Sequence, residues 1–246
     1  MSKTHLWITG GGSGIGRSVA RAAAAEGMLV TVSGRREDAL EETSRDHASI
    51  FPAILDVTDA VGVDAVLDAI EMRHGPVDIA ILNAARYQAM DAADFDSAGF
   101  RDHIETNVMG TVHCLAPLLA RMRRRRKGRI VLIASVAGYR GLPKAAAYGP
   151  TKAALINLAE SLRPGAAVDG VIIQVVNPGF VETPMTAGNQ FPMPFLISPE
   201  RAASHILAGL RRDVFEIAFP WPFVMLLKAA RLLPYRLYFA LTRRML

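Results

Sequence analysis

Short apolar runs alternate along this chain with longer segments in which apolar and polar residues recur at helical spacing. The short runs are apolar throughout, which is typical of strands buried on both faces. They predict strands at residues 5–9, 29–33, 50–56, 77–83, 130–135 and 171–177, with a weaker one at 215–218. The amphipathic segments predict helices at residues 15–26, 37–46, 60–74, 100–123, 148–162 and 199–211. This alternation predicts an α/β fold, a single Rossmann-type doubly wound parallel sheet with helices on both faces.

A glycine-rich segment directly follows the first predicted strand and opens the first predicted helix. In that position a loop lets its backbone approach a pyrophosphate, and the helix N-terminus favours negative charge. The sequence therefore predicts a dinucleotide site whose phosphate loop comprises Gly10, Gly12, Ser13, Gly14, Ile15 and Gly16.

The end of the second predicted strand bears on which dinucleotide binds. An NAD site usually has an acidic residue there, bound to the adenosine ribose, but this strand ends in Ser33-Gly34-Arg35-Arg36. Guanidinium groups suit a 2′-phosphate. We expect NADP (NADPH) to be favoured over NAD, with Arg35 as a contact; for Arg36, an exposed position at a helix start is the alternative.

The third and fourth predicted strands end in polar residues and small residues at the same edge of the sheet. We expect Asp56, Val57, Asn83 and Ala84 to line the cofactor site there. Asp56 can accept a hydrogen bond from the adenine amino group. Its alternative role is to cap the next helix, although Thr58 and Asp59 are better placed for that.

Tyr148 and Lys152 are spaced to share one face of a helix, and Ser135 ends the fifth predicted strand. The lysine ammonium can stabilise a tyrosine phenolate, whose usual pKa of about 10 makes it a poor acid or base at neutral pH. The serine hydroxyl can hold a carbonyl oxygen. The alternative for Tyr148 and Lys152 alone is a solvated helix face.

These motifs together resemble the short-chain dehydrogenase/reductase family over about the first 210 residues. The matching segments are TGGGSGIG at 9–16, LDV at 55–57, LNAA at 82–85, TN at 106–107, IASVAG at 133–138, YGPTK at 148–152 and NPGFVET at 177–183. The resemblance implies that Tyr148 donates or accepts the proton and that Lys152 lowers its pKa and holds the nicotinamide ribose. It also implies that Ser135 orients the substrate oxygen and that Asn107 supports a proton relay through water.

The resemblance further implies that the loop after the sixth strand holds the nicotinamide end of the cofactor, through Pro178, Gly179, Val181 and Thr183. The chain departs from the family pattern at Leu82 and Ala85, which replace an asparagine and a glycine, and at Gly149-Pro150 in the active-site helix. Proline is tolerated in the first turn of a helix. The Ala85 methyl group puts cofactor affinity in question more than chemistry.

The expected activity is hydride transfer between nicotinamide and a carbonyl or secondary alcohol, with carbonyl reduction as the expected direction. Residues 184–198, the expected substrate lid within a 1–220 oxidoreductase domain, are uncharged up to Ser198 and rich in Met and Phe. They favour an apolar or lipid-like substrate, unless these side chains simply pack the lid onto the core. The alternative function is a catalytically silent NADP-binding regulator or scaffold.

Composition narrows the remaining choices. A single cysteine, Cys114, excludes an internal disulfide, and the N-terminus lacks signal-peptide features, so we expect a cytoplasmic protein. No metal site and no transmembrane helix are predicted. The net charge of +5 and the basic run at 121–129 could suggest nucleic acid. That run lies where a helix ends and a strand begins, remote from the cofactor edge, and we expect a solvated face rather than a nucleic-acid site.

The last segment, 221–246, is apolar and basic. Residues 217–246 contain no Asp or Glu, and Pro234 should divide the tail into two short helices. The tail is expected to serve either as a subunit interface of a homodimer or homotetramer or as a peripheral membrane contact.

Overall fold

A parallel seven-stranded sheet forms the centre of the computed structural model, which describes residues 3–243. The strand order is β3-β2-β1-β4-β5-β6-β7, so the predicted doubly wound fold is confirmed. The strands are β1 (His5–Thr9), β2 (Leu29–Gly34), β3 (Ile50–Ile54), β4 (Ile79–Leu82), β5 (Gly128–Ile133), β6 (Val171–Pro178) and β7 (Glu216–Phe219). The helices are α1 (Gly14–Ala25), α2 (Glu37–Ser44), α3 (Ala60–His74), α4 (Ser97–His103), α5 (Gly110–Arg124), α6 (Tyr148–Val168), α7 (Pro199–Leu210), α8 (Trp221–Arg231) and α9 (Tyr235–Thr242).

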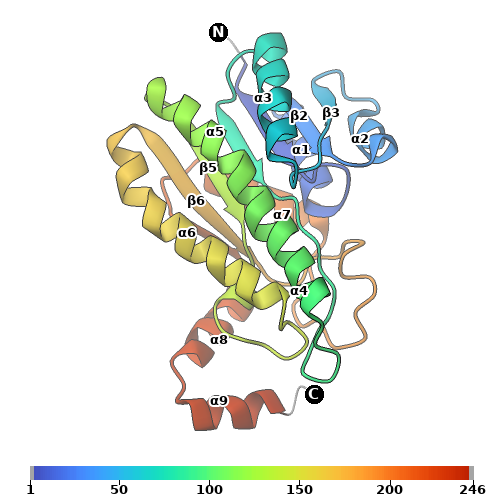
Figure 1. Cartoon of the computed structure of the whole chain (residues 1–246), viewed down its shortest axis with the longest axis vertical. Helices are drawn as coiled ribbons and strands as arrows, with labels where there is room; N and C mark the ends of the chain where they lie inside the picture. The colour runs from blue at the N-terminus through green and yellow to red at the C-terminus, as the bar shows by residue number, and fades with distance from the viewer. Residues whose placement is uncertain (1–2, 244–246) are drawn as a thin grey trace.

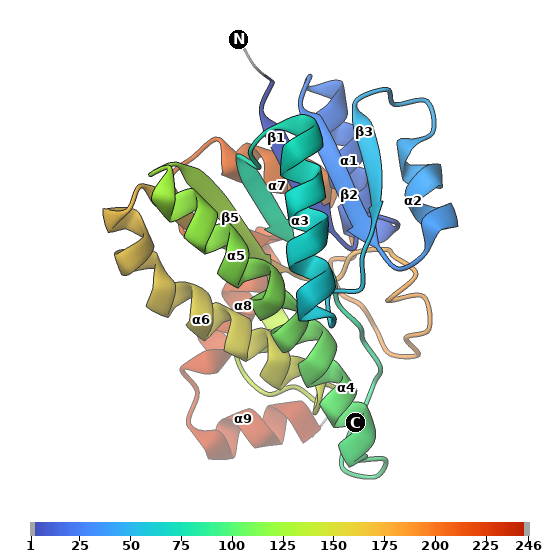
Figure 2. The same ribbon diagram turned by 45° about the horizontal axis from the view of Figure 1, so that its top comes forward.

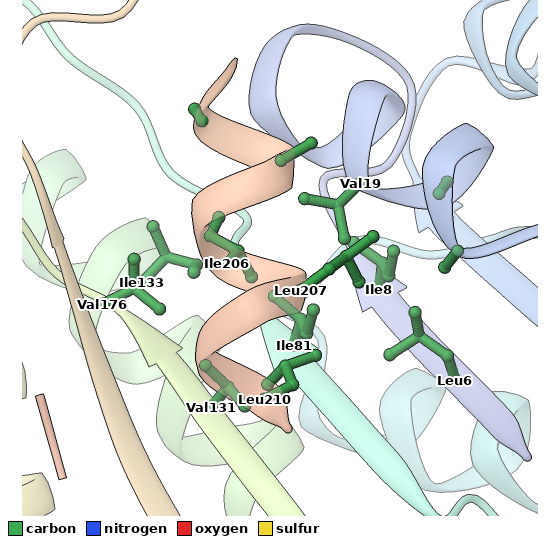
Figure 3. Packing of buried hydrophobic residues seen from close by; sticks show 14 of the residues in the cluster. Leu6, Ile8, Val19, Ile81, Val131, Ile133, Val176, Ile206, Leu207 and Leu210 are labelled. Carbon is green, nitrogen blue, oxygen red and sulfur yellow. The ribbon is translucent and has the colours of Figure 1, made fainter. Parts of the chain in front are cut away.

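Alternate residues of each central strand enter two separate cores, because side chains on a strand point to opposite faces. Leu6 and Ile8 of β1 join the core under α1 and α7, which Figure 3 shows from close by. Trp7, between them, belongs to the core under α3, α5 and α6. Both views of the molecule show these three helices together on one face of the sheet (Figures 1 and 2). Burial on both faces explains why the strands are apolar throughout.

Two helices differ from the sequence prediction. The single helix expected at 100–123 is a composite of α4, a π-helical turn at Ile104–Met109, and α5. The helix expected at 148–162 continues past Pro164 to Val168. The missing Pro164 N–H leaves the carbonyl of exposed Glu160 without its helical donor, and water can hydrate that carbonyl. Helical periodicity alone distinguishes neither a π-helical turn from a regular helix nor a helix that continues past a proline from one that ends before it.

The basic run was expected to be a solvated face, and this expectation was wrong for Arg121, Arg125 and Arg129, which are partly buried. Arg129 donates to the Gln174 side-chain oxygen at 2.6 Å. Arg121 is ion-paired with Asp64, Asp68 and Glu71 of α3, and Arg125 is ion-paired with Glu71. Partial burial of Glu71 raises its pKa, but bonds from Val77 and both arginines outweigh this and hold the pKa below its usual value. The run therefore joins α5 to α3, a contact between elements far apart in sequence.

The tail forms two helices, α8 and α9, and Pro234 precedes the first residue of α9 as predicted. Figures 1 and 2 place both at the end of the molecule opposite the N-terminus. Of the basic residues of the tail at 221–246, Arg244 lies outside the described residues.

Candidate active site

The phosphate loop joins β1 to α1 in a conformation that glycine permits. Gly10 and Gly14 have positive φ angles of 68° and 50°, a region that disfavours side chains. A Cβ on Gly16 would lie 2.4 Å from the Gly10 carbonyl oxygen. The loop is therefore packed tightly against the start of α1, with the helix N-terminus beside it. This cradle fits the pyrophosphate of a dinucleotide.

Two side chains that sequence reasoning missed bind the carbonyl groups of this loop. Arg17 donates from Nη2 to the Gly12 oxygen at 2.6 Å. The Thr43 hydroxyl donates to the Gly11 oxygen at 3.0 Å. Because they satisfy loop acceptors, these bonds fix the backbone that we predict to hold phosphate. Neither residue lies in a motif, and Thr43 reaches the loop only through the packing of α2.

One end of the cofactor groove lies at the ends of β2 and β3. It is lined by five residues that we predicted to contact the cofactor: Arg35, Arg36, Asp56, Val57 and Ala84. Gly34, Leu55 and Thr106 also line it; sequence reasoning did not assign them, although Thr106 directly precedes Asn107 in a recognised motif. Both arginines are exposed, so their guanidinium groups are accessible to a charged ligand.

Asp56 lies in the loop after β3. One carboxylate oxygen accepts hydrogen bonds from the Thr58 backbone N–H at 3.0 Å and from its hydroxyl at 2.8 Å. Partial burial raises its pKa, but these bonds and the Arg35 charge outweigh that effect and place the pKa below the usual value. Asp59, not Asp56, caps α3 by accepting from the Gly62 N–H. The second oxygen of Asp56 is available to an adenine amino group.

The other end of the groove contains the predicted chemistry. It is lined by Ile15, Ser135, Tyr148, Lys152, Pro178, Gly179, Val181 and Thr183. Gly10, Ser13 and Ala85 line both ends, which makes the two a continuous groove. It lies at the carboxyl ends of the strands, where the order reverses between β1 and β4, the usual ligand position of such sheets.

Asn83 is a predicted cofactor contact, and its side-chain amide nitrogen donates hydrogen bonds to the end of β1 and the phosphate loop. Its Nδ2 donates to the Thr9 and Gly10 carbonyl oxygens at 3.0 and 3.1 Å. The Thr9 hydroxyl in turn accepts from the backbone N–H groups of Asn83 and Ala84. These bonds tie the ends of β1 and β4 together beneath the groove.

Ser135, Tyr148 and Lys152 converge at this end. The Lys152 ammonium nitrogen lies 5.4 Å from the centre of the Tyr148 ring and donates to the Ile133 carbonyl oxygen at 2.8 Å. Burial lowers the pKa of Lys152 to about 7. Burial also raises the pKa of Tyr148, and the neighbouring Ser135 hydroxyl opposes part of that rise. Tyr148 is therefore a protonated phenol at neutral pH in this structure.

Asn107 lies in the π-helical turn, and its side-chain hydrogen bonds within the described chain go to residues other than Ser135, Tyr148 and Lys152. Its Nδ2 donates to the Arg86 carbonyl oxygen at 3.0 Å and to the Thr151 hydroxyl at 3.1 Å, and its Oδ1 accepts from the Arg86 N–H at 2.8 Å. The side chain thus connects the loop after β4 to α6, beside Lys152. π-turns often occur at functional sites.

The sequence analysis also missed Tyr87, whose ring meets the Tyr148 ring edge-on with centroids 5.1 Å apart. It lies four residues beyond Asn83, outside the recognised motif. On the lid side, Pro184, Met185 and Thr186 line the groove. Apolar and aromatic side chains therefore surround the point at which a substrate would meet Tyr148.

Comparison with known proteins gives consistent matches. The family model described as short chain dehydrogenase matches residues 4–191. A Myxococcus xanthus protein described as an uncharacterized oxidoreductase is 35% identical over 250 residues, covering 100% of this chain and 98% of that protein.

Two solved structures are also similar. A variant of actinorhodin polyketide ketoreductase with NADPH has a TM-score of 0.80 and 27% identity, covering 89% of this chain and 97% of that one. ElxO with NADP bound has a TM-score of 0.78 and 26% identity, covering 88% and 97%.

Proposed function

Because the chain belongs to the short-chain dehydrogenase family, whose members are oxidoreductases that bind a nicotinamide cofactor, we propose that it is an NADPH-dependent reductase of apolar, lipid-like carbonyl compounds. The observation that carries this proposal is the convergence of Ser135, Tyr148 and Lys152 at one end of the groove. Arg35 and Arg36 at the other end support NADP, since both are exposed and suit a 2′-phosphate.

The bound nicotinamide would supply the hydride. Pro178, Gly179, Val181 and Thr183 would hold that end of the cofactor, and Lys152 would hold its ribose. Tyr148 would donate a proton to the substrate oxygen, and Ser135 would hold that oxygen as negative charge develops. The Tyr148 phenol, whose pKa is raised by burial, carries the proton that reduction consumes, and a pKa lowered by the Lys152 ammonium would make that proton easier to transfer.

The lid supports an apolar substrate. Met185 lines the groove, and Phe195 and Leu196 are exposed. Among the groups that line this end of the groove in the described chain, only Lys152 is cationic, and it is buried. A sugar phosphate would have no accessible cation here, whereas a hydrocarbon chain would gain from burial.

Substitution of Tyr148 by Phe tests the mechanism. We expect turnover of NADPH with a panel of apolar ketones and acyl thioesters to fall by about 100- to 10,000-fold, the contribution of a general acid. NADPH binding, followed by fluorescence, should change little. Tyr235→Phe, on the exposed surface of α9, is the matched control and should keep full turnover.

Substantial turnover by Tyr148→Phe would reject the proposed proton donor. An alternative function, a silent NADP-binding regulator, would instead show NADPH binding and no turnover with any member of the panel in the unmodified chain. Assaying NADPH and NADH in parallel separates the cofactor from the reaction.

A further inference from the structure

The tail exposes many large apolar side chains. Trp221 is 71% exposed, Leu232 85% and Tyr235 71%. The other exposed apolar residues of this surface, which we call the tail surface, are Met225, Leu226, Leu237, Phe239 and Leu241. Large contiguous apolar patches on a protein surface usually mark an interaction site.

These side chains are exposed although both helices are docked on the domain. Phe223 and Val224 of α8 are buried in a small core with Val136 and Tyr139. Tyr238 of α9 donates its hydroxyl proton to the Gly141 carbonyl oxygen. Each helix thus presents a narrow stripe to the body. The apolar residues on the remaining faces of the two helices are exposed and are left for a partner.

The tail surface is also basic. Arg231, Arg236 and Arg243 are exposed, and none forms an ion pair with a carboxylate of the described chain. Lys228 is paired with Glu216. Residues 217–246 contain no acidic residue. Any partner would therefore meet apolar groups surrounded by uncompensated positive charge.

We propose that α8 and α9 dock on the surface of an anionic lipid bilayer. Aromatic and aliphatic side chains with flanking arginines are the composition of an interfacial helix. A second copy of the chain fits less well, because a two-fold interface brings the same patch together from both subunits. In such an interface the arginines of one tail would find no carboxylate on the other tail, since residues 217–246 contain no acidic residue.

Attachment would be at the bilayer surface. Within residues 3–243, no helix is long and apolar enough to cross a membrane. The lid adjoins α8, since the Phe195 and Phe223 rings lie 6.0 Å apart, and Phe195 is 50% exposed. Transfer of an apolar substrate from lipid to the groove would follow from this proximity. That last step rests on the proposed function, but the docking itself does not.

Vesicle flotation tests the proposal without any assay of turnover. The full chain should float with phosphatidylcholine vesicles that contain phosphatidylserine and much less with phosphatidylcholine alone. Added salt should weaken the binding. Arg231→Gln and Arg236→Gln should each reduce the partition coefficient by about fivefold. Leu232→Asp and Leu237→Asp should reduce it further, and all four positions are exposed, so the fold should persist.

The matched controls are Met72→Asp and Val168→Asp, which change apolar residues that are 88% and 74% exposed on α3 and α6. They should leave flotation unchanged. Flotation that is absent, or equal in all variants, would overturn the proposal. Light scattering supplies the competing outcome: a chain that does not float, and whose oligomers dissociate when Leu232 or Leu237 becomes Asp, uses this surface for a second copy.

Discussion

Arg35 is the residue that we propose to control the choice between the two nicotinamide cofactors. It lies one residue beyond β2, is exposed, and lines the groove beside Asp56. We expect Arg35→Ala to weaken NADPH by roughly ten- to a hundredfold, since a charged hydrogen bond contributes about 1.5–3 kcal/mol, and to leave NADH nearly unchanged. Titration of both cofactors measures this. Equal losses would show that Arg35 does not contact the 2′-phosphate.

Lys152 should make stability depend on pH. Its pKa is lowered to about 7 in the folded chain, whereas the unfolded chain retains the usual value of about 10.4. Between these two pKa values the unfolded state binds more protons than the folded state. The free energy of unfolding therefore increases steadily as the pH is raised from about 7 toward about 10. The higher free energy of unfolding is fully present above the pKa of Lys152 in the unfolded chain. It is lost as the pH falls through the pKa of Lys152 in the folded chain.

Lys152→Met should remove this dependence while keeping much of the side-chain volume. Urea unfolding from pH 7 to 9 should give a free energy that rises more steeply in the unmodified chain, by about 1 kcal/mol per pH unit. Other titrating groups affect both proteins alike. Parallel pH profiles would mean that Lys152 stays charged throughout, bonded to the Ile133 carbonyl.

At the scale of elements, Arg140 connects the active-site segment to the tail. Its Nη1 donates to the carbonyl oxygens of Ala230 at 2.7 Å, Arg231 at 3.1 Å and Leu233 at 2.8 Å. Its guanidinium carbon lies 3.8 Å from the centre of the Tyr238 ring. One side chain thus binds the end of α8 and the face of α9.

Arg140→Met should therefore loosen α8 and α9 without unfolding the sheet. We expect amide hydrogen exchange to accelerate in residues 225–242 and to stay slow in β1, β4 and β5, because local opening follows local contacts. Arg140→Lys should rescue little, since an ammonium lacks the planar fork and its stacking. If protection were lost equally in tail and sheet, the tail would belong to the same cooperative unit as the domain.

For the whole molecule, local patterns were sufficient for the sheet but not for the contacts that join distant segments. The apolar runs predicted the seven strands of the sheet but not their order within it, and the glycine loop and Tyr148–Lys152 spacing pointed to one edge of the sheet. The hydrogen bond from Thr43 to the Gly11 carbonyl and the pairing of Arg121 with α3 depend on how helices pack. No spacing within either segment encodes these contacts.

In the candidate active site too, local sequence patterns predicted which residues take part but not the contacts that they make. Asn107 was predicted from a motif, but its place in a π-helical turn, bonded to Arg86 and Thr151, could not be read from helical periodicity. The tail was predicted as two helices because Pro234 interrupts it. That Arg140 holds both helices could not be predicted, because the partners are about ninety residues apart.

The order of the groove and the tail surface along the chain has a consequence for biosynthesis, because α8 and α9 follow every residue that lines the groove. A chain leaves the ribosome N-terminus first, and its domains begin to fold as they emerge. Every residue that lines the groove lies between Gly10 and Thr186, and the central pairing of β1 with β4 joins Leu6 to Ile79. The nascent chain can therefore begin to assemble its groove before translation reaches α8. The segment that we propose to bind lipid therefore emerges only after every residue that lines the groove.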